Sequence, residues 1–418
     1  MRSIHTPYAR RPPVPITLPA PVDTFPFPLR CLCLSVLLLA AACSDSTRPE
    51  DRGVDLDRLF APATEAEVAH VRGEWATRTA EAIDVRQEAS GPFPIAGVPG
   101  RLRILSHRVD GERHYGAVVV AEGATARSLP VLVYAHGGDS GVSVEELALL
   151  FLALGEGASG FVWVVPSFRS EPLRSGTRVF LSEGEPSPWD RDVDDALSLL
   201  TVALQEEPAA DPERIAVLGL SRGGGVGLLM GARDPRVKAV VSFFGPTDFF
   251  DPWMREIAEE ALQGRPRDLP GLAWFDRTYL QPLRRGEVSL DAVRRELIRR
   301  SPALFAPSLP AVQIHHGTAD PVVAFSQAER LDTVMRELGR GEPSYQFFAY
   351  PGGGHSPLGL TGSIERTAAF LIRYVGSPLL AAPSIPRMRS AVVGEAPLPP
   401  GDPDTAEVIQ SPSPLRVF

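Results

Sequence analysis

The sequence predicts an α/β fold in which a mostly parallel central sheet is flanked by helices, and two observations lead to this prediction. From about residue 129, short and continuously apolar runs alternate with stretches of helical periodicity. Continuous apolar runs are typical of strands buried on both faces, because helices cover both sides of a parallel sheet. The alternation continues to about residue 375, so it covers most of the 418-residue chain.

The individual elements follow one another in a regular order without an internal repeat. Two strands, over residues 101–109 and 115–123, flank the turn signal Asp110-Gly111 and are expected to form a hairpin. Further strands are predicted over residues 129–136, 160–167, 214–220, 236–244, 311–317 and 344–350. Helices are predicted over residues 144–154, 192–204, 324–338 and 363–375, and another begins near Arg222.

Residues 61–376 are expected to form one domain, with two additions to the alternating pattern. Residues 62–98 are predicted to be an N-terminal helical region, because apolar residues recur there on one helical face. Residues 249–305 contain large aromatic residues and many charges but no clear strand, which predicts a helical cap inserted over the strand ends. Residues 377–418 are rich in proline and lack periodicity, so we expect a disordered tail.

The first 42 residues are predicted to be an export signal. Residues 31–42 are an apolar run after a basic region, too short for a bilayer span of about 20 residues. Small residues lead to Cys43, as in bacterial lipoprotein signals, where this cysteine carries the lipid. We expect an exported protein anchored to a bacterial membrane through Cys43 alone, with residues 43–60 as a tether. The alternative is an ordinary cleaved signal with an incidental cysteine.

Composition and charge exclude several classes of function. The formal net charge of −9 argues against a general affinity for nucleic acid or anionic lipid surfaces. All three cysteines lie within the first 43 residues, so the body of the chain has no thiol for a disulfide, metal or nucleophile. The eight histidines lack the paired spacing of a metal site, and His70, His107 and His114 are expected at the surface. We expect neither a metal nor a cofactor.

Ser221 is the predicted nucleophile. The strand over residues 214–220 leads directly into a helix through Gly219-Leu220-Ser221-Arg222-Gly223, which fits the pattern G-x-S-x-G. A serine hydroxyl reacts only when it is held exposed beside a base, and a sharp strand-to-helix turn does this. Each glycine in the helix that follows costs about 1 kcal/mol relative to alanine, which indicates that this helix packs very close to the strands. The alternative is an ordinary glycine-rich turn.

The predicted base and acid follow the serine along the chain. His355 lies just after the last strand, in a glycine-rich loop, and Asp320 lies just after the preceding strand. Asp320 would hold the imidazole of His355 in the required tautomer and stabilise its cation. Asp248 is the rival acid, although it is also suited to begin a cap helix. His315 and His316 end a strand and are expected to pack or hydrogen-bond there.

An oxyanion hole needs two backbone N–H groups. We expect one from Arg222, directly after the nucleophile, and the other from Gly138 or Asp139 in the loop His136-Gly137-Gly138-Asp139. The alternative for this loop is a simple strand-to-helix turn. The acids at 190, 192, 194 and 195 are expected to serve a helix N-terminus electrostatically. Arg169 could reach a substrate carboxylate, but such an arginine more often pairs with nearby acids.

Together these stretches resemble the catalytic domain of the prolyl oligopeptidase family, within the α/β-hydrolase superfamily. The matching stretches are HGGD (136–139), PSFRS (166–170), GLSRGG (219–224), SPALF (301–305), HHGTADPVV (315–323) and GGGHS (352–356). The resemblance implies a serine hydrolase that acts on peptide or ester bonds without metal or cofactor. The sequence departs from the family pattern because HGGD replaces the usual HGGP, and because too few residues lie between Cys43 and the predicted catalytic core for the family's β-propeller.

Three functions are compatible with these residues. The first is a serine hydrolase that cleaves a small peptide or ester substrate. The second is a carboxylesterase for short acyl esters, which the departures from the family pattern favour. It would be similar to relatives without a propeller, such as esterases and dienelactone-hydrolase-like enzymes. The third is a lipid-anchored binding protein without activity, which retention of the serine, acid and histidine argues against.

Overall fold

The computed structural model describes residues 53–376, except for residues 79–80 and 82. The predicted export signal, Cys43 and the proline-rich segment 377–418 lie outside the described residues. Within the described part of the chain, no helix combines the length and apolar character needed to cross a membrane.

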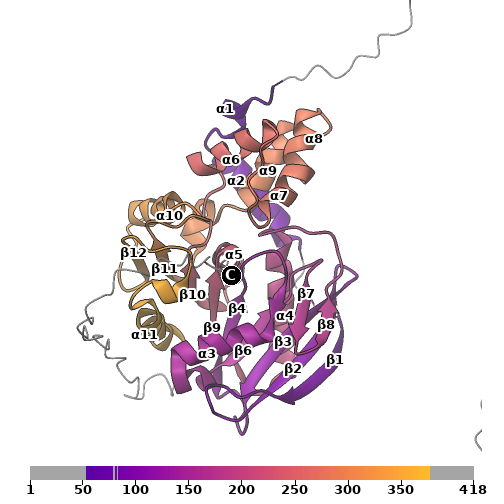
Figure 1. Ribbon diagram of the computed structural model, residues 1–418, viewed down its shortest axis with the longest axis vertical. Coiled ribbons are helices and arrows are strands. Elements are labelled where there is room, and N and C mark those ends of the chain that lie inside the picture. Colours follow the sequence, from indigo (N-terminus) through magenta and orange to yellow (C-terminus); the bar gives the residue numbers. More distant parts are fainter. Residues whose placement is uncertain (1–52, 79–80, 82, 377–418) are drawn as a thin grey trace, which may run out of the picture. The chain divides into compact units, whose positions relative to one another are not determined.

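A nine-stranded sheet forms the centre of the described chain, in the order β1-β2-β3-β6-β4-β9-β10-β11-β12 (Figure 1). The first three strands run antiparallel, β3 pairs antiparallel with β6, and every pair from β6 to β12 is parallel. Their bounds are β1 (Ile83–Pro92), β2 (Gly100–Val109), β3 (Glu112–Ala121), β4 (Leu129–Ala135), β6 (Val162–Pro166), β9 (Ala210–Leu220), β10 (Val237–Phe243), β11 (Ala311–Gly317) and β12 (Tyr345–Tyr350). The prediction of a mostly parallel sheet is therefore confirmed.

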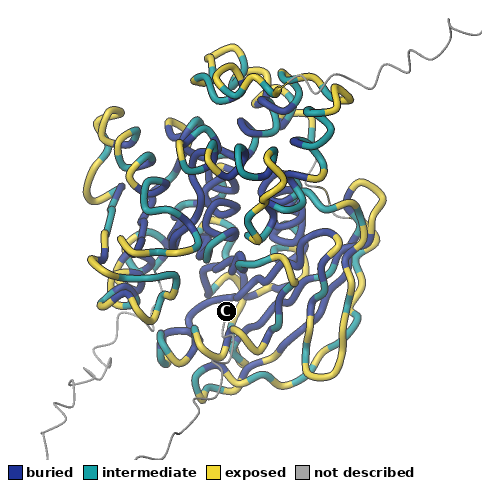
Figure 2. The backbone as a smooth tube through the Cα atoms, turned by 45° about the horizontal axis from the view of Figure 1, so that its top comes forward, coloured by how far each residue is buried: buried dark blue, intermediate teal, exposed yellow. Residues whose placement is uncertain are grey.

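Helices cover both faces of the sheet and bury two separate apolar cores. On one face lie α4 (Arg191–Glu206), α5 (Arg222–Arg233) and α10 (Ser326–Glu337), and on the other lie α3 (Leu147–Leu154) and α11 (Ser363–Val375). The central strands are continuously buried, including all seven residues of β4 and of β11 (Figure 2). Burial on both faces explains why these strands are apolar throughout rather than alternating.

The segment between β10 and β11, which is called the cap below, is helical in its described structure. It contains α6 (Pro252–Leu262), α7 (Leu272–Phe275), the π-helical turn η3 (Asp276–Leu280), α8 (Gln281–Arg284), α9 (Leu290–Arg299) and the 3-10 helix η4 (Pro302–Ser308). Helices α1 (Leu56–Leu59) and α2 (Glu65–Ala76) lie beside it in Figure 1. Arg294 on α9 joins them, because its guanidinium binds Glu67 and the backbone carbonyls of Arg58 and Leu59.

Three expectations from the sequence need correction. Helix α1 begins inside the predicted tether 43–60, and the predicted helical region 62–98 is helical only as far as the end of α2. Residues 83–92 form the edge strand β1, whose side chains are mostly exposed, so that no apolar pattern marks it as a strand. His107 and His114 are buried rather than at the surface, because they face each other across β2 and β3 beneath α4.

A second, smaller sheet was not predicted either. It consists of β5 (Val142–Ser143), β7 (Pro172–Ser175) and β8 (Arg178–Leu181), in the order β5-β7-β8. Its strands are two to four residues long, which is too short to produce a recognisable alternation.

The glycines of α5 let this helix lie directly against the sheet, as the sequence predicted. A Cβ atom on Gly223 would come within 1.9 Å of the Ala135 carbonyl oxygen in β4. A Cβ on Gly227 would come within 2.9 Å of Val217 in β9, and one on Gly231 within 2.9 Å of Val240 in β10. The intrinsic helix penalty of these glycines is therefore offset by close contact with three strands.

We predict that Gly223→Ala destabilises the protein strongly. The added methyl group would meet backbone atoms that cannot rotate away, and overpacking of this kind costs about 1–3 kcal/mol or more. Gly73→Ala is the matched control, because Gly73 also lies within a helix but has open space around it. Thermal unfolding should show a lower Tm for Gly223→Ala and an equal or higher Tm for Gly73→Ala. Equal stability of the two variants would contradict the close packing of α5.

Candidate active site

Ser221 occupies a strained turn between β9 and α5. Its φ of 55° and ψ of −121° are unusual for a residue with a side chain. Its N–H donates to the Phe243 carbonyl in the neighbouring strand β10 (2.9 Å). A Cβ on Gly219 would lie 2.1 Å from the Gly223 carbonyl oxygen, so the turn requires glycine at both ends of the motif. This is the geometry that the spacing G-x-S-x-G predicts.

His355 and Asp320 are hydrogen-bonded to each other. The distance from His355 Nδ1 to Asp320 Oδ2 is 2.7 Å, and the Asp320 side chain is fully buried while that of His355 is 18% exposed. The other carboxylate oxygen accepts the N–H groups of Val322 and Val323. Burial alone would raise the pKa of Asp320, but the hydrogen bonds to His355 and to the backbone outweigh it and lower the pKa. Asp320 is therefore held as a carboxylate against the imidazole.

The other candidates considered from the sequence have different partners. The Asp248 carboxylate binds the Arg330 guanidinium (2.9 Å) and accepts the Phe250 N–H, just before α6. His315 is buried between the rings of Phe243 and Phe348 and hydrogen-bonds Tyr350 and Gln313, and His316 donates to the Val323 carbonyl. Both histidines thus pack and hydrogen-bond within the sheet.

Topology brings the serine, the acid and the histidine to one edge of the sheet. Strands β9, β10, β11 and β12 are parallel neighbours, and Ser221, Asp320 and His355 follow the carboxyl ends of β9, β11 and β12. Phe244, at the end of β10, lies between them and contacts the His355 ring with a centroid distance of 4.1 Å. The carboxyl edge of a parallel sheet is where ligand sites of α/β proteins form.

The loop after β4 lies against Ser221. A Cβ on Gly137 would come within 3.1 Å of the Ser221 Cβ, so a side chain here would crowd the serine. Gly138 has a φ of 72°, and its carbonyl accepts a hydrogen bond from Arg222 Nη1 (3.1 Å). The Asp139 carboxylate accepts the Gly271 N–H at the start of α7 (3.2 Å), which connects the loop to the cap. Of the predicted residues, Arg222 directly follows the serine, Gly138 is hydrogen-bonded to Arg222, and Asp139 is bound to Gly271.

The side chain of Arg222 has a structural environment that the sequence did not reveal. Its buried guanidinium makes two 2.8 Å hydrogen bonds to Asp192 and another to Glu171. Burial lowers the pKa of the guanidinium, but the two carboxylates reverse this and raise it. Burial also raises the pKa of Glu171, and its neighbour His136 has a pKa lowered by burial to about 4. Arg222 therefore fixes the direction of the Gly138 carbonyl through a charge network beneath the site.

The remaining acids at the start of α4 are also buried and paired. Asp190 binds Arg78, Asp194 binds Arg233, and Asp195 binds Arg169 through both carboxylate oxygens. The predicted role at a helix N-terminus is therefore incomplete, because each acid neutralises an arginine distant in sequence. Arg169 is thus paired with a buried acid, which is more common for such an arginine than contact with a substrate carboxylate.

A small apolar cavity opens beside Ser221. Its volume is about 30 Å³, and it lies between the serine, Val322 after Asp320, and the cap residues Trp253 and Leu269. Trp189, which lies just before α4, forms another wall. Among the residues that the structure describes, no group of three or more His, Cys, Asp or Glu side chains could hold a metal ion.

Several solved structures are similar to this chain. The chain resembles acetyl xylan esterase 1 from Thermoanaerobacterium sp. JW/SL YS485 with 19% identity and a TM-score of 0.52, covering 78% of this chain and 99% of that one. A second similar structure is the acetyl xylan esterase from Paenibacillus sp. R4 (18% identity, TM-score 0.49, 77% of this chain and 95% of that one). A third is a Mycobacterium tuberculosis puromycin-hydrolyzing peptidase (22% identity, TM-score 0.46, 68% of this chain), of which this chain spans only 40%.

The similarity to acetyl xylan esterase 1 shows an α/β-hydrolase fold, but it does not identify a substrate for this chain. Among curated proteins, no match is found. A family model does match, over residues 151–377, which is more than half of the chain and includes Ser221, Asp320 and His355. The model describes the prolyl oligopeptidase family, and this chain is accordingly a member of that family of hydrolases.

Proposed function

We propose that this chain is a serine hydrolase that forms an acyl-enzyme on Ser221, with His355 as general base and Asp320 as its carboxylate partner. The observation that carries the proposal is the 2.7 Å hydrogen bond between His355 Nδ1 and the buried Asp320 carboxylate, at the same sheet edge as the strained Ser221 turn. A carboxylate at Nδ1 leaves Nε2 of the neutral imidazole as the acceptor for a serine proton.

In the proposed reaction, Ser221 Oγ attacks the carbonyl carbon of the substrate while His355 Nε2 takes the hydroxyl proton. The imidazolium then gives this proton to the leaving alcohol or amine, and the acyl group remains on Ser221. A water molecule, deprotonated by His355, then attacks the acyl carbon; the bond to Ser221 Oγ breaks, His355 returns the proton to this oxygen, and the acid leaves. Asp320 stays ionised throughout, consistent with its lowered pKa.

The negative oxygen of the tetrahedral intermediate would be stabilised by backbone N–H groups. Arg222 is the first residue of α5, and the first N–H groups of a helix have no carbonyl partner within the helix. The second donor is the N–H of Gly138 or Asp139, in the loop that lies against Ser221. The hydrogen bond from Arg222 Nη1 to the Gly138 carbonyl would keep the peptide group between Gly138 and Asp139 in one orientation.

The small cavity beside Ser221 favours esters of short acyl groups as substrates. A volume of about 30 Å³ holds two or three water molecules and therefore about two or three carbon atoms. Its lining is almost entirely apolar, and an ester also needs less protonation of its leaving group than an amide does. Peptides are the second candidate class of substrate, because the family to which the chain belongs is named for prolyl oligopeptidases.

Exchange of the acid provides the first test, with the rival acid as control. We expect Asp320→Asn to lower kcat by about 10³–10⁴-fold, because the amide would stabilise the wrong tautomer of His355. Asp248→Asn should alter kcat less than tenfold in correctly folded protein, since Asp248 pairs with Arg330. Steady-state ester hydrolysis by both variants, with circular dichroism as the folding check, makes the comparison. A larger loss for Asp248→Asn would move the acid to that residue.

A second prediction concerns the size and type of substrate. The kcat/KM for p-nitrophenyl acetate should exceed those for p-nitrophenyl octanoate and for p-nitroacetanilide by at least about tenfold, or roughly 1.4 kcal/mol of transition-state free energy. Leu269→Ala should enlarge the cavity and narrow the difference between acetate and octanoate. Leu283→Ala is the control, because Leu283 is also a half-buried cap leucine but does not line the cavity. Preference for the anilide would identify an amidase instead.

A further inference from the structure

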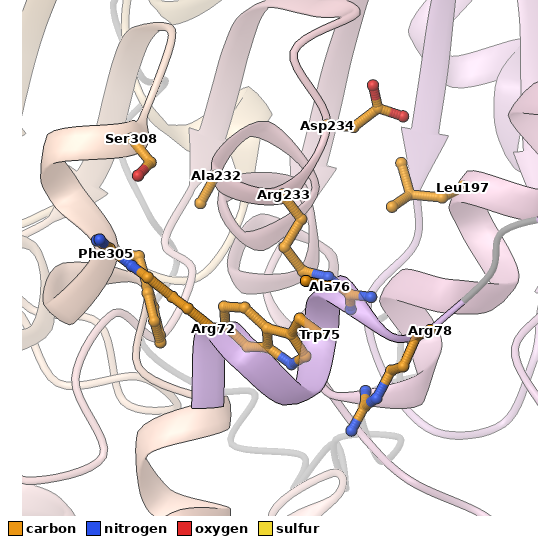
Figure 3. Close-up of a pocket in the computed structure, with 10 residues that line it drawn as sticks. All are labelled: Arg72, Trp75, Ala76, Arg78, Leu197, Ala232, Arg233, Asp234, Phe305 and Ser308. Carbon is orange, nitrogen blue, oxygen red and sulfur yellow. The ribbon is translucent and has the colours of Figure 1, made fainter. Parts of the chain in front are cut away.

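A second and larger cavity lies away from the candidate active site. Its volume is about 300 Å³, and its walls come from α2, α4, the carboxyl end of α5, and η4 (Figure 3). Ser221 precedes the first residue of α5, whereas Arg233 at the cavity is the last residue of this helix. A 12-residue helix is about 18 Å long, so the two sites are distinct.

Two aromatic rings and two arginines stack within this cavity. The rings of Trp75 on α2 and Phe305 on η4 lie with their centroids 4.4 Å apart. The Arg233 guanidinium lies over the Trp75 ring at 5.1 Å, and that of Arg72 over Phe305 at 5.5 Å. Figure 3 shows Arg233 extending from α5 toward Trp75, while Arg72 extends from α2 toward Phe305. The wall is thus both apolar and cationic.

The charges around the cavity do not balance. Arg78 binds Asp190 and Asp194, and Arg233 shares Asp194 with it. The third arginine of the wall, Arg72, is exposed and has no ion pair within the described residues. The acid at the wall, Asp234, is already bound to Arg236. Three guanidinium groups therefore face the cavity with two carboxylates between them, although the whole chain carries a net charge of −9.

Arg233 also leaves a donor unused. Its side chain is only 9% exposed, and its buried Nη1 has no hydrogen-bond partner within the described part of the chain. An unsatisfied buried donor is unfavourable, and more so when the group is charged. A ligand that accepts a hydrogen bond from this nitrogen would remove that cost. Arg233 lines the cavity but this nitrogen has almost no accessible surface, so an acceptor bound there would reach it only after the guanidinium turns outward.

We propose that this cavity binds a small organic anion, in which a phosphate or carboxylate is attached to an aromatic or otherwise planar apolar body. The anionic group would bind Arg72 and Nη1 of Arg233, because guanidinium groups pair strongly with these oxyanions. The apolar body would lie against the exposed part of Trp75, whose neighbour Phe305 is buried behind it. A volume of 300 Å³ is at the lower end of the range of small-molecule sites, which restricts the ligand to a single ring or a chain of similar size.

Phenyl phosphate is a suitable probe, and isothermal titration calorimetry of the full chain measures its binding. We expect wild-type protein to bind phenyl phosphate at least about tenfold more tightly than phenol or inorganic phosphate, because each of these lacks half of the recognised chemistry. Benzoate in parallel separates the two sources of the anion, since tighter binding of phenyl phosphate assigns the site to phosphates and the reverse assigns it to carboxylates.

Variants at the exposed edge of the cavity complete the test without disturbing the buried ion pairs. Arg72→Gln should weaken phenyl phosphate binding at least about tenfold, and Ala76→Phe should abolish it by filling the space. Arg277→Gln is the matched control, because Arg277 is exposed, has no ion pair within the described residues and lies outside the cavity. An unchanged Tm shows that each variant folds.

Equal binding by wild type and Arg72→Gln, an equal loss in Arg277→Gln, or no binding to wild type would each overturn the proposal. The readout is binding rather than turnover, so its failure is independent of the proposed hydrolase activity.

Discussion

The close contact between α5 and the strands β4 and β9 is the constraint on which the rest of the site depends. Gly219 and Gly223 lie so near to each other, and Gly223 so near to Ala135, that no side chain fits between them. The chain can therefore turn sharply from strand to helix, which leaves Ser221 with a positive φ at the edge of the sheet. The strain of this residue is sustained by the packing on both sides of it.

A buried charge network makes this arrangement specific. The same turn places Arg222 in the interior, where an unpaired guanidinium would be very unfavourable. Asp192 and Glu171 neutralise it, and another of its N–H groups binds the Gly138 carbonyl. Through these hydrogen bonds, Arg222 connects α4, the loop after β6 and the loop after β4. The nucleophile turn and the proposed oxyanion loop are thus joined by the Arg222 side chain.

The sequence predicted the parts of the fold that depend on local pattern. Continuous apolar strands and the spacing of the glycines around Ser221 identified the parallel sheet and the family, and both predictions are confirmed. The assignment of Ser221, Asp320 and His355 as catalytic residues stays a prediction, which the His355–Asp320 hydrogen bond supports. The edge strand β1 escaped notice because most of its residues are exposed and show no apolar alternation. The ion pairs of the acids in α4 could not be predicted either, because their arginines are remote in sequence and only the tertiary fold brings them together.

Covalent labelling tests the central claim most directly. A fluorophosphonate reacts with a serine only where a base and an oxyanion site activate the hydroxyl. The account predicts a single adduct, located on Ser221 by peptide mass spectrometry, which is absent from Ser221→Ala and much slower to form in His355→Ala. No adduct on folded protein, or the same labelling of Ser221→Ala, would contradict it.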